Sequence, residues 1–274
     1  MYLEYFNLKE KQFEMTPDSR FLYLTPQHED AIGHCQLTIN ERRGLVAVYG
    51  SVGMGKTTIA RRVRETSLQD PRNEVAMLIT PALNTKQALL RAIMAEFNVP
   101  TKRSYDLSMV AFRQFIIDKA QQGKSLVLII DEAQELTPKM LKALHSLLNF
   151  ESDTEKFIQL VLVGQNELAT NIDRQPAIKS RVARFSQLQN LTYDDTAELI
   201  AFRWHTASAG KSSHPFSDKA LEAIYMFSDG LPREIIKLCH ETLLSAMVSE
   251  TKEVTADMVV AAAKELRLSA KGDK

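Results

Sequence analysis

Short hydrophobic runs recur along the first 190 residues of the chain, and stretches with helical periodicity separate them. Four runs are rich in Val, Leu or Ile and contain few polar positions: 45–49, 75–79, 126–130 and 160–163. A fifth and weaker run covers 183–188. Continuous hydrophobic runs are typical of parallel strands that helices cover on both faces. The pattern therefore predicts a parallel sheet.

The intervening stretches favour helices. Hydrophobic residues recur at helical spacing over 57–67, 86–97 and 108–122. Strands that alternate with helices in this way predict an α/β fold.

After residue 190 only helical patterns remain. They cover 192–205, 217–227, 231–248 and 255–268, and the first begins with Thr192 as a cap and two aspartates in its first turn. We therefore expect an α/β domain over 1–190, an all-helical domain over 191–268 and a flexible tail over 269–274.

The composition excludes several classes of protein. The 274 residues include 34 Lys+Arg and 34 Asp+Glu, which excludes nucleic-acid binding by bulk positive charge but not by a local basic patch. No hydrophobic run is long enough for a membrane span, and 1–11 does not resemble a signal peptide. Cys35 and Cys239 lack metal-ligand spacing. We expect a cytoplasmic protein with two reduced cysteines.

A glycine-rich segment follows the first predicted strand and opens the first predicted helix. It matches the phosphate-binding pattern GxxxxGK[ST] in full, with Gly50, Ser51, Val52, Gly53, Met54, Gly55, Lys56 and Thr57. Glycines let backbone N–H groups surround a phosphate, and the helix start adds positive potential. We expect Lys56 to contact the β- and γ-phosphates of ATP, Thr57 to bind Mg²⁺, and Thr58 to belong to the nucleotide-binding residues. The alternative is a glycine-rich turn without a ligand.

Two adjacent acids, Asp131 and Glu132, follow the hydrophobic run 126–130. The carboxyl ends of parallel strands form the edge where such sheets bind ligands. Asp131 is suited to the Mg²⁺ shell, and Glu132 to accepting a proton from the attacking water as general base. A solvated acidic turn is the alternative interpretation.

A further predicted strand ends in amides. We expect Gln165, or alternatively Asn166, to hold the attacking water or to sense the γ-phosphate. The alternative is an amide that simply enters a loop.

Basic residues outside these segments are candidates for completing the site. The segment 174–184 contains four basic residues and no acid, so Arg181 or Arg184 is a candidate arginine finger toward a neighbouring subunit. Arg233, at a helix start in the tail, is a candidate phosphate contact. The alternatives are a solvated basic helix end and an ordinary helix start.

These elements, in this order, resemble an AAA+ ATPase, and further motifs resemble the ExeA/GspA-like group. Four segments carry this resemblance: Tyr5-Phe6-Asn7-Leu8 and 16–23 near the N-terminus, and the strand ends Ile130-Asp131-Glu132-Ala133-Gln134 and Leu162-Val163-Gly164-Gln165. It implies a P-loop NTPase with a five-stranded parallel sheet, a helical lid, and ATP sites shared between subunits of a ring or filament. It also implies that 1–40 lies on the adenine side, with Thr16 to Tyr23 either contacting the base or packing.

One departure from the group affects the expected role. Secretion-type members carry a transmembrane helix and a periplasmic domain after the lid, whereas this sequence ends at Lys274. We therefore expect a short form that resembles the TnsC, TniB and Mu B type of ATPase. That resemblance implies double-stranded DNA, a transposase and a target-selection protein as partners of the homo-oligomer.

Lys86, Lys102 and Arg103 are candidate contacts to DNA phosphates, although a Lys-Arg pair in a loop is more often simply solvated. An ATPase for assembly of a secretion or pilus machine is the alternative function. A loader ATPase in replication is a third.

Overall fold

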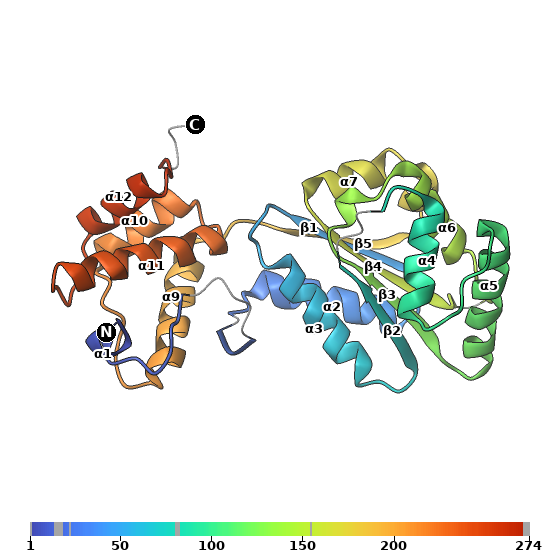
Figure 1. Ribbon diagram of the computed structural model, residues 1–274, viewed down its shortest axis with the longest axis horizontal. Helices are drawn as coiled ribbons and strands as arrows, with labels where there is room; N and C mark the ends of the chain where they lie inside the picture. The colour runs from blue at the N-terminus through green and yellow to red at the C-terminus, as the bar shows by residue number, and fades with distance from the viewer. Residues whose placement is uncertain (1, 14–18, 22, 80–82, 154, 271–274) are drawn as a thin grey trace. The chain divides into compact units, whose positions relative to one another are not determined.

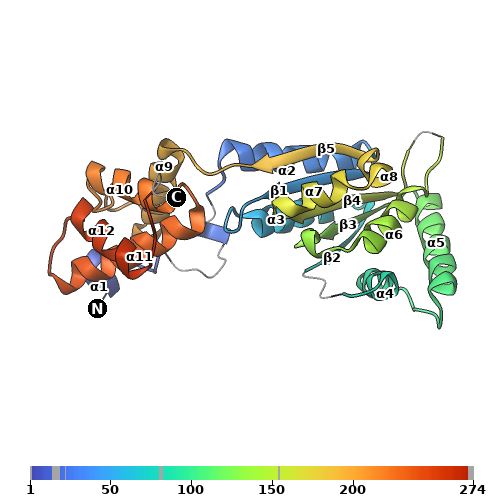
Figure 2. The ribbon, with the colours of Figure 1, turned by 90° about the horizontal axis from the view of Figure 1, so that it is seen from above.

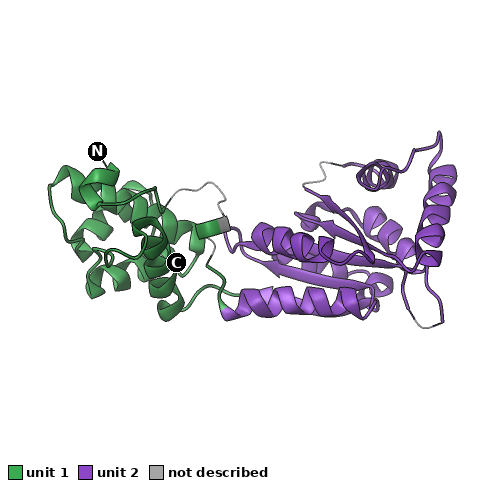
Figure 3. Cartoon of the chain, turned by 90° about the horizontal axis from the view of Figure 1, so that it is seen from below, with its two compact units in different colours: residues 1–25, 189–274 green, residues 26–188 purple. Residues whose placement is uncertain are grey.

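The computed structural model describes residues 2–13, 19–21, 23–79, 83–153 and 155–270. The chain divides into two compact units (Figure 3). One consists of 26–188 and is called the α/β unit. The other combines 1–25 with 189–274 and is called the helical unit.

The α/β unit is built on a parallel five-stranded sheet (Figure 1). Its strands are β1 (Leu45–Gly50), β2 (Asn73–Leu78), β3 (Ser125–Ile130), β4 (Ile158–Gly164) and β5 (Val182–Leu188). They pair in the order β2-β3-β4-β1-β5, and all four pairings are parallel. The α/β class and all five predicted strands are confirmed.

Helices cover both faces of the sheet, which explains why the strands lack polar alternation. Helices α2 (Pro26–Asn40) and α3 (Lys56–Leu68) pack on one face. The helices α4 (Lys86–Glu96), α5 (Tyr105–Gln121), α6 (Pro138–Leu148), α7 (Asn166–Asp173) and α8 (Pro176–Lys179) lie on the other side (Figure 2).

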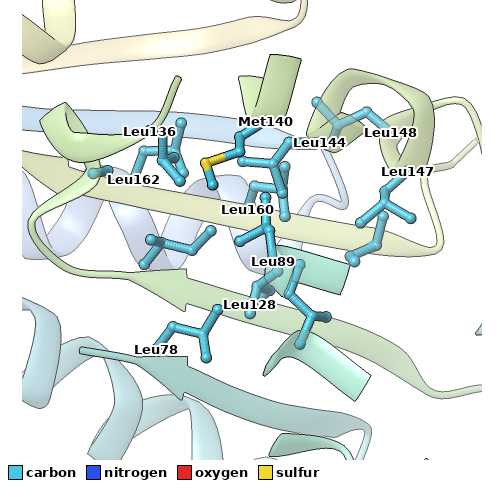
Figure 4. Packing of buried hydrophobic residues seen from close by; sticks show 14 of the residues in the cluster. Leu78, Leu89, Leu128, Leu136, Met140, Leu144, Leu147, Leu148, Leu160 and Leu162 are labelled. Carbon is cyan, nitrogen blue, oxygen red and sulfur yellow. The ribbon is translucent and has the colours of Figure 1, made fainter. Parts of the chain in front are cut away.

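The larger core lies under α4 and α6. Leu128 and Leu160 point from the central strands toward Leu89 and Leu144, and all four side chains are buried (Figure 4). The neighbouring strand residues, such as Val127, are also buried, so the central strands β1, β3 and β4 contribute to packing on both faces.

The helical unit contains α9 (Tyr193–Ser208), α10 (Asp218–Ser228), α11 (Pro232–Val248) and α12 (Ala256–Glu265), close to the four predicted helices. Thr192 caps α9 as expected: its hydroxyl accepts the N–H of Asp195 at 3.1 Å, and the Asp195 carboxylate accepts the N–H of Thr192 at 3.2 Å.

The N-terminal segment packs in the helical unit, whereas the sequence analysis grouped 1–40 with the α/β domain. Phe6 of α1 (Tyr2–Phe6) meets Trp204 edge to face at 5.9 Å, and Phe13 meets Phe216 at 6.2 Å. These buried aromatic contacts between distant parts of the sequence explain the grouping.

The segment 16–23, expected near the adenine, is described only at 19–21 and 23. Phe21 of η1 (Ser19–Phe21) lies under the guanidinium of Arg203, and Tyr23 hydrogen-bonds Glu198, so both have partners within the helical unit. Residues 16–18 and 22 lie outside the described residues.

Among the described residues, no helix is both long and hydrophobic enough to cross a bilayer. Cys35 on α2 and Cys239 on α11 are free, buried thiols, one in each unit.

Candidate nucleotide-binding site

The glycine-rich loop connects β1 to α3, as the motif requires. Gly53 and Gly55 have φ values of 85° and 80°, a region in which a side chain would be strained. A Cβ at Gly50 would lie 2.8 Å from the backbone oxygen of Leu188 on β5. Glycine is therefore required for both the shape of the loop and the close approach of β5.

The loop presents backbone donors without acceptors. Among the described residues, none accepts a hydrogen bond from the N–H groups of 53–57, whereas the N–H of Thr58 already bonds Gly55 at 2.9 Å. These five donors surround the start of α3, where the helix dipole adds positive potential. Thr57 lies in the first turn of α3 and is half-buried. This arrangement fits an anion such as a phosphate.

Lys56 is the first residue of α3 and is only 7% exposed. Its Nζ donates to the backbone oxygen of Ser51 at 2.7 Å, so the side chain folds back over the loop. Burial lowers the pKa of Lys56, and the carboxylates of Glu132, Asp131 and Glu167 act in the opposite direction. Carboxylates from two other segments therefore favour the charged form of the ammonium group.

The imidazole of His28 on α2 contacts the backbone of the loop. The Nε2 atom of this buried imidazole lies 2.9 Å from the backbone oxygen of Met54, which is itself buried. A Cβ added to Gly55 would lie 3.4 Å from the same nitrogen. Nothing in the sequence pattern identifies His28 as part of the site, because α2 lies outside the motif.

Asp131 and Glu132 directly follow β3. Asp131 is 1% exposed, and its Oδ1 accepts the backbone N–H of Glu132 at 3.0 Å. Glu132 has φ 54°, an unusual value that turns the chain sharply at the strand end. The two carboxylates have different partners: Asp131 accepts a backbone N–H, whereas Glu132 accepts side-chain amides.

The carboxylate of Glu132 is held by two amides. Its Oε2 accepts Nε2 of Gln134 at 2.6 Å and, at a longer 3.5 Å, Nε2 of Gln165. Gln165 is half-buried at the cap of α7, whereas Asn166 is exposed. Gln134 was not among the predicted site residues, although it lies within the strand-end motif Ile130-Asp131-Glu132-Ala133-Gln134.

The strand register places the three segments at one edge of the sheet. Tyr49 pairs with Gly164, so the loop after β1 lies beside Gln165 after β4. Ile130 pairs with Leu162, so Asp131 and Glu132 follow at the same edge. Free N–H donors, a buried lysine and two carboxylates are the donor set that a nucleoside triphosphate with Mg²⁺ requires. The residues present therefore fit both groups.

The candidate finger residues lie away from this edge. Arg181 precedes β5 and donates to Asn149 at 3.1 Å and to Glu151 at 3.5 Å. Val182 pairs with Leu45, so Arg181 lies at the amino edge of the sheet, about 15–20 Å from the loop by the rise of a strand. Arg184 lies on the edge strand with Nη1 3.1 Å from Nε2 of His34.

Other predicted contacts are distributed over both units. Arg233 is exposed in the first turn of α11, within the helical unit. Lys86, Lys102 and Arg103 come together where α4 and α5 connect: Gln87 Nε2 donates to the Arg103 oxygen at 3.5 Å, and Lys86 Nζ lies 4.0 Å from the Tyr105 ring centre. Lys102 and Arg103 are exposed.

Comparison with known proteins identifies the fold. Residues 39–172 match the family model of the AAA domain. The solved ORC2 protein of Aeropyrum pernix, in ADPNP and ADP complexes, is 18% identical and has a TM-score of 0.65, with 93% of this chain and 71% of that chain covered. The RuvB Holliday junction branch migration motor of Thermotoga maritima is 21% identical with a TM-score of 0.57, covering 87% and 69%. The chain has the fold of AAA+ P-loop ATPases.

A curated relative matches nearly the whole chain. General secretion pathway protein A of Aeromonas hydrophila is 32% identical over 268 residues, which cover 96% of this chain. The chain spans about half (48%) of the length of that relative. None of these three proteins is named for transposition, so the expected transposition role stays a prediction.

Proposed function

We propose that the chain binds ATP with Mg²⁺ in the loop between β1 and α3 and hydrolyses it to ADP and phosphate. The observation that carries this proposal is the row of unpartnered N–H groups over 53–57 beside Lys56, facing the same sheet edge as Asp131, Glu132 and Gln165. A merely structural turn has no need of such a row of free donors next to two carboxylates.

In this proposal the loop holds the β- and γ-phosphates through backbone N–H groups and through Lys56, which exchanges its bond to Ser51 for phosphate oxygens. Thr57 and Asp131 hold Mg²⁺, with Thr58 adjacent. Mg²⁺ supplies charge that neutralises the phosphate oxygens. The carboxylate of Glu132 accepts a proton from water as the water oxygen bonds the γ-phosphorus. The bond from that phosphorus to the bridging oxygen breaks, and its electrons leave with ADP.

Shared sites in a homo-oligomer form the second part of the proposal. Arg181 or Arg184 is proposed to act as an arginine finger on the phosphates of a neighbouring subunit, because Arg181 lies at the end of β5 opposite to its own loop and Arg184 lies on the edge strand. Arg233 is proposed to contact the phosphates from the helical unit. Mixing Arg181→Ala subunits with Lys56→Ala subunits should restore part of the activity. If Arg181→Ala alone leaves hydrolysis unchanged, Arg184 becomes the candidate.

Two biological settings for this ATPase are proposed, both cytoplasmic. A DNA-binding regulator of transposition is supported by the cluster of Lys86, Lys102 and Arg103, which suits DNA phosphates. An ATPase that supports a secretion machine is supported by the 32% identity with the Aeromonas secretion protein.

The experiment that tests the ATPase itself is phosphate release from ATP and Mg²⁺ by the purified chain. Lys56→Ala should reduce the rate at least 100-fold by removing a phosphate contact, whereas Lys142→Ala, an exposed lysine on α6, should leave it unchanged. Equal rates for the chain and for Lys56→Ala would refute the proposal.

The two settings are separated by electron microscopy with double-stranded DNA and a non-hydrolysable ATP analogue. Rings or filaments that retain DNA, and lose it when Lys102 and Arg103 are both changed to Ala, support the DNA regulator. Indifference to DNA together with co-purification with membrane fractions supports the secretion setting. Neighbouring genes for a transposase or for secretion proteins provide an independent check.

A further inference from the structure

The side chain of Gln134 joins the ends of β3 and β4. Its Nε2 donates to Oε2 of Glu132 at 2.6 Å, and its Oε1 accepts the backbone N–H of Gln165 at 2.9 Å. The backbone oxygen of Gln134 in turn accepts Nδ2 of Asn171 at 3.1 Å. Both ends of the carboxamide are therefore used, and the backbone that carries it is tied to α7.

Gly164, which has no side chain, leaves room for the carboxamide of Gln134. A Cβ added to Gly164 would lie 2.8 Å from Oε1 of Gln134 and 3.0 Å from its backbone nitrogen. Any larger residue at 164 would displace the amide from its position between the two strand ends. The glycine that ends β4 is thus matched to the glutamine that follows β3.

These contacts make the two oxygens of Glu132 different. Oε2 accepts hydrogen bonds from Gln134 and from Gln165. Oε1 accepts none from any residue that the structure describes. A carboxylate with one oxygen fixed has little rotational freedom, so the direction in which the other oxygen points is also fixed.

We propose that Gln134 is a positioning residue for hydrolysis, which fixes Oε2 of Glu132 so that Oε1 is the oxygen that accepts the proton of the attacking water. This inference rests on the proposed function, in which Glu132 is the general base. Because the same carboxamide bonds the N–H of Gln165, a displacement of Gln165 is transmitted to the base. Gln134 itself does not contact the reacting atoms.

Two substitutions separate the two hydrogen bonds. Gln134→Met has nearly the same length but neither donates nor accepts comparably, so it removes both bonds. Gln134→Glu retains an acceptor for the N–H of Gln165 but loses the donor to Glu132. Gln114→Met is the matched control, because Gln114 is an exposed amide on α5 whose hydrogen-bond partner among the described residues is Asp118, at 2.8 Å.

The first measurement is steady-state hydrolysis together with ATP binding. Gln134→Met and Gln134→Glu should lower kcat about 10- to 100-fold, the usual cost of misplacing a reacting group, with KM and the Kd for ATP changed less than about threefold. The double variant of Glu132→Gln with Gln134→Met should be no slower than Glu132→Gln alone, since Gln134 acts through Glu132. Gln114→Met should match the unmodified chain.

The second measurement needs no nucleotide. Amide hydrogen exchange at Gln165, followed by NMR, should accelerate in Gln134→Met and remain slow in Gln134→Glu, which keeps the acceptor. A kcat within twofold of the unmodified chain in both variants would overturn the inference, as would multiplicative losses in the double variant. If Lys56→Ala and Glu132→Gln also retain full hydrolysis, the proposed function itself fails, and the two failures are thereby distinguished.

Discussion

The two compact units differ in the positions of their buried polar and aromatic side chains. In the α/β unit, strands and the helices that cover them form a mainly aliphatic core, and the buried polar side chains of Lys56, Asp131 and His28 lie near one sheet edge. In the helical unit, aromatic side chains such as Phe6 and Trp204 join helices that are distant in sequence. The residues of the proposed chemistry are therefore concentrated in the α/β unit, whereas the core of the helical unit depends on packing with the N-terminal segment.

Each unit carries one thiol that reports on its opening. Cys35 lies in the α/β unit and Cys239 in the helical unit, and both are fully buried. Burial raises the pKa of Cys35 to about 12 and also raises that of Cys239. Neither thiol is ionised near neutral pH, so reaction with a disulfide reagent requires opening of the unit that contains it.

Phe6→Ala should cause the largest difference in stability between the two units. Truncating a buried aromatic costs about 3–5 kcal/mol, and here the loss falls on the helical unit. Labelling of Cys239 should accelerate about 100-fold or more, while that of Cys35 changes little. Phe185→Ala, a partly exposed aromatic on β5, is the control. Acceleration at Cys35 alone would mean that 1–25 stabilises the α/β unit instead.

Gly230→Ala should weaken the same unit by a different mechanism. A Cβ at this position would lie 2.2 Å from the backbone oxygen of Leu191, and φ is 68°. We expect the free energy of unfolding of the helical unit to fall by about 2–4 kcal/mol. Denaturation followed by the fluorescence of Trp204, the single tryptophan, measures this change. Gly33→Ala on α2 meets open space and should stabilise the α/β unit by about 0.5–1 kcal/mol. A loss for Gly33→Ala that equals the loss for Gly230→Ala would contradict the steric argument.

Bound nucleotide should stabilise the α/β unit against opening more than the helical unit. A non-hydrolysable ATP analogue at about 100 times its Kd stabilises the state that binds it by about 2.7 kcal/mol. Labelling of Cys35 should slow accordingly, and Lys56→Ala should abolish the effect. If Arg233 contacts the phosphates, Cys239 is protected as well, and Arg233→Ala removes only that protection. Equal slowing with and without Lys56 would contradict the assigned site.

Local patterns predicted the parts of the fold that local chemistry determines. Four of the strands coincide with continuous hydrophobic runs and the fifth with a weaker one, and the phosphate loop is a contiguous motif, so both were identified from the sequence. The packing of 1–25 in the helical unit was not, because it depends on contacts such as Phe6 with Trp204. His28 and Gln134 were missed for the same reason: each acts through a backbone or side-chain atom brought near only by folding.

Glu132 is proposed as the base of an ATPase whose loop binds nucleotide independently of this residue. Comparing ATP affinity and single-turnover hydrolysis in the unmodified chain and in Glu132→Gln tests this role. We expect an unchanged Kd for ATP and hydrolysis slowed about 10²- to 10⁴-fold, the usual contribution of a general base. Hydrolysis by Glu132→Gln at the unmodified rate would contradict it.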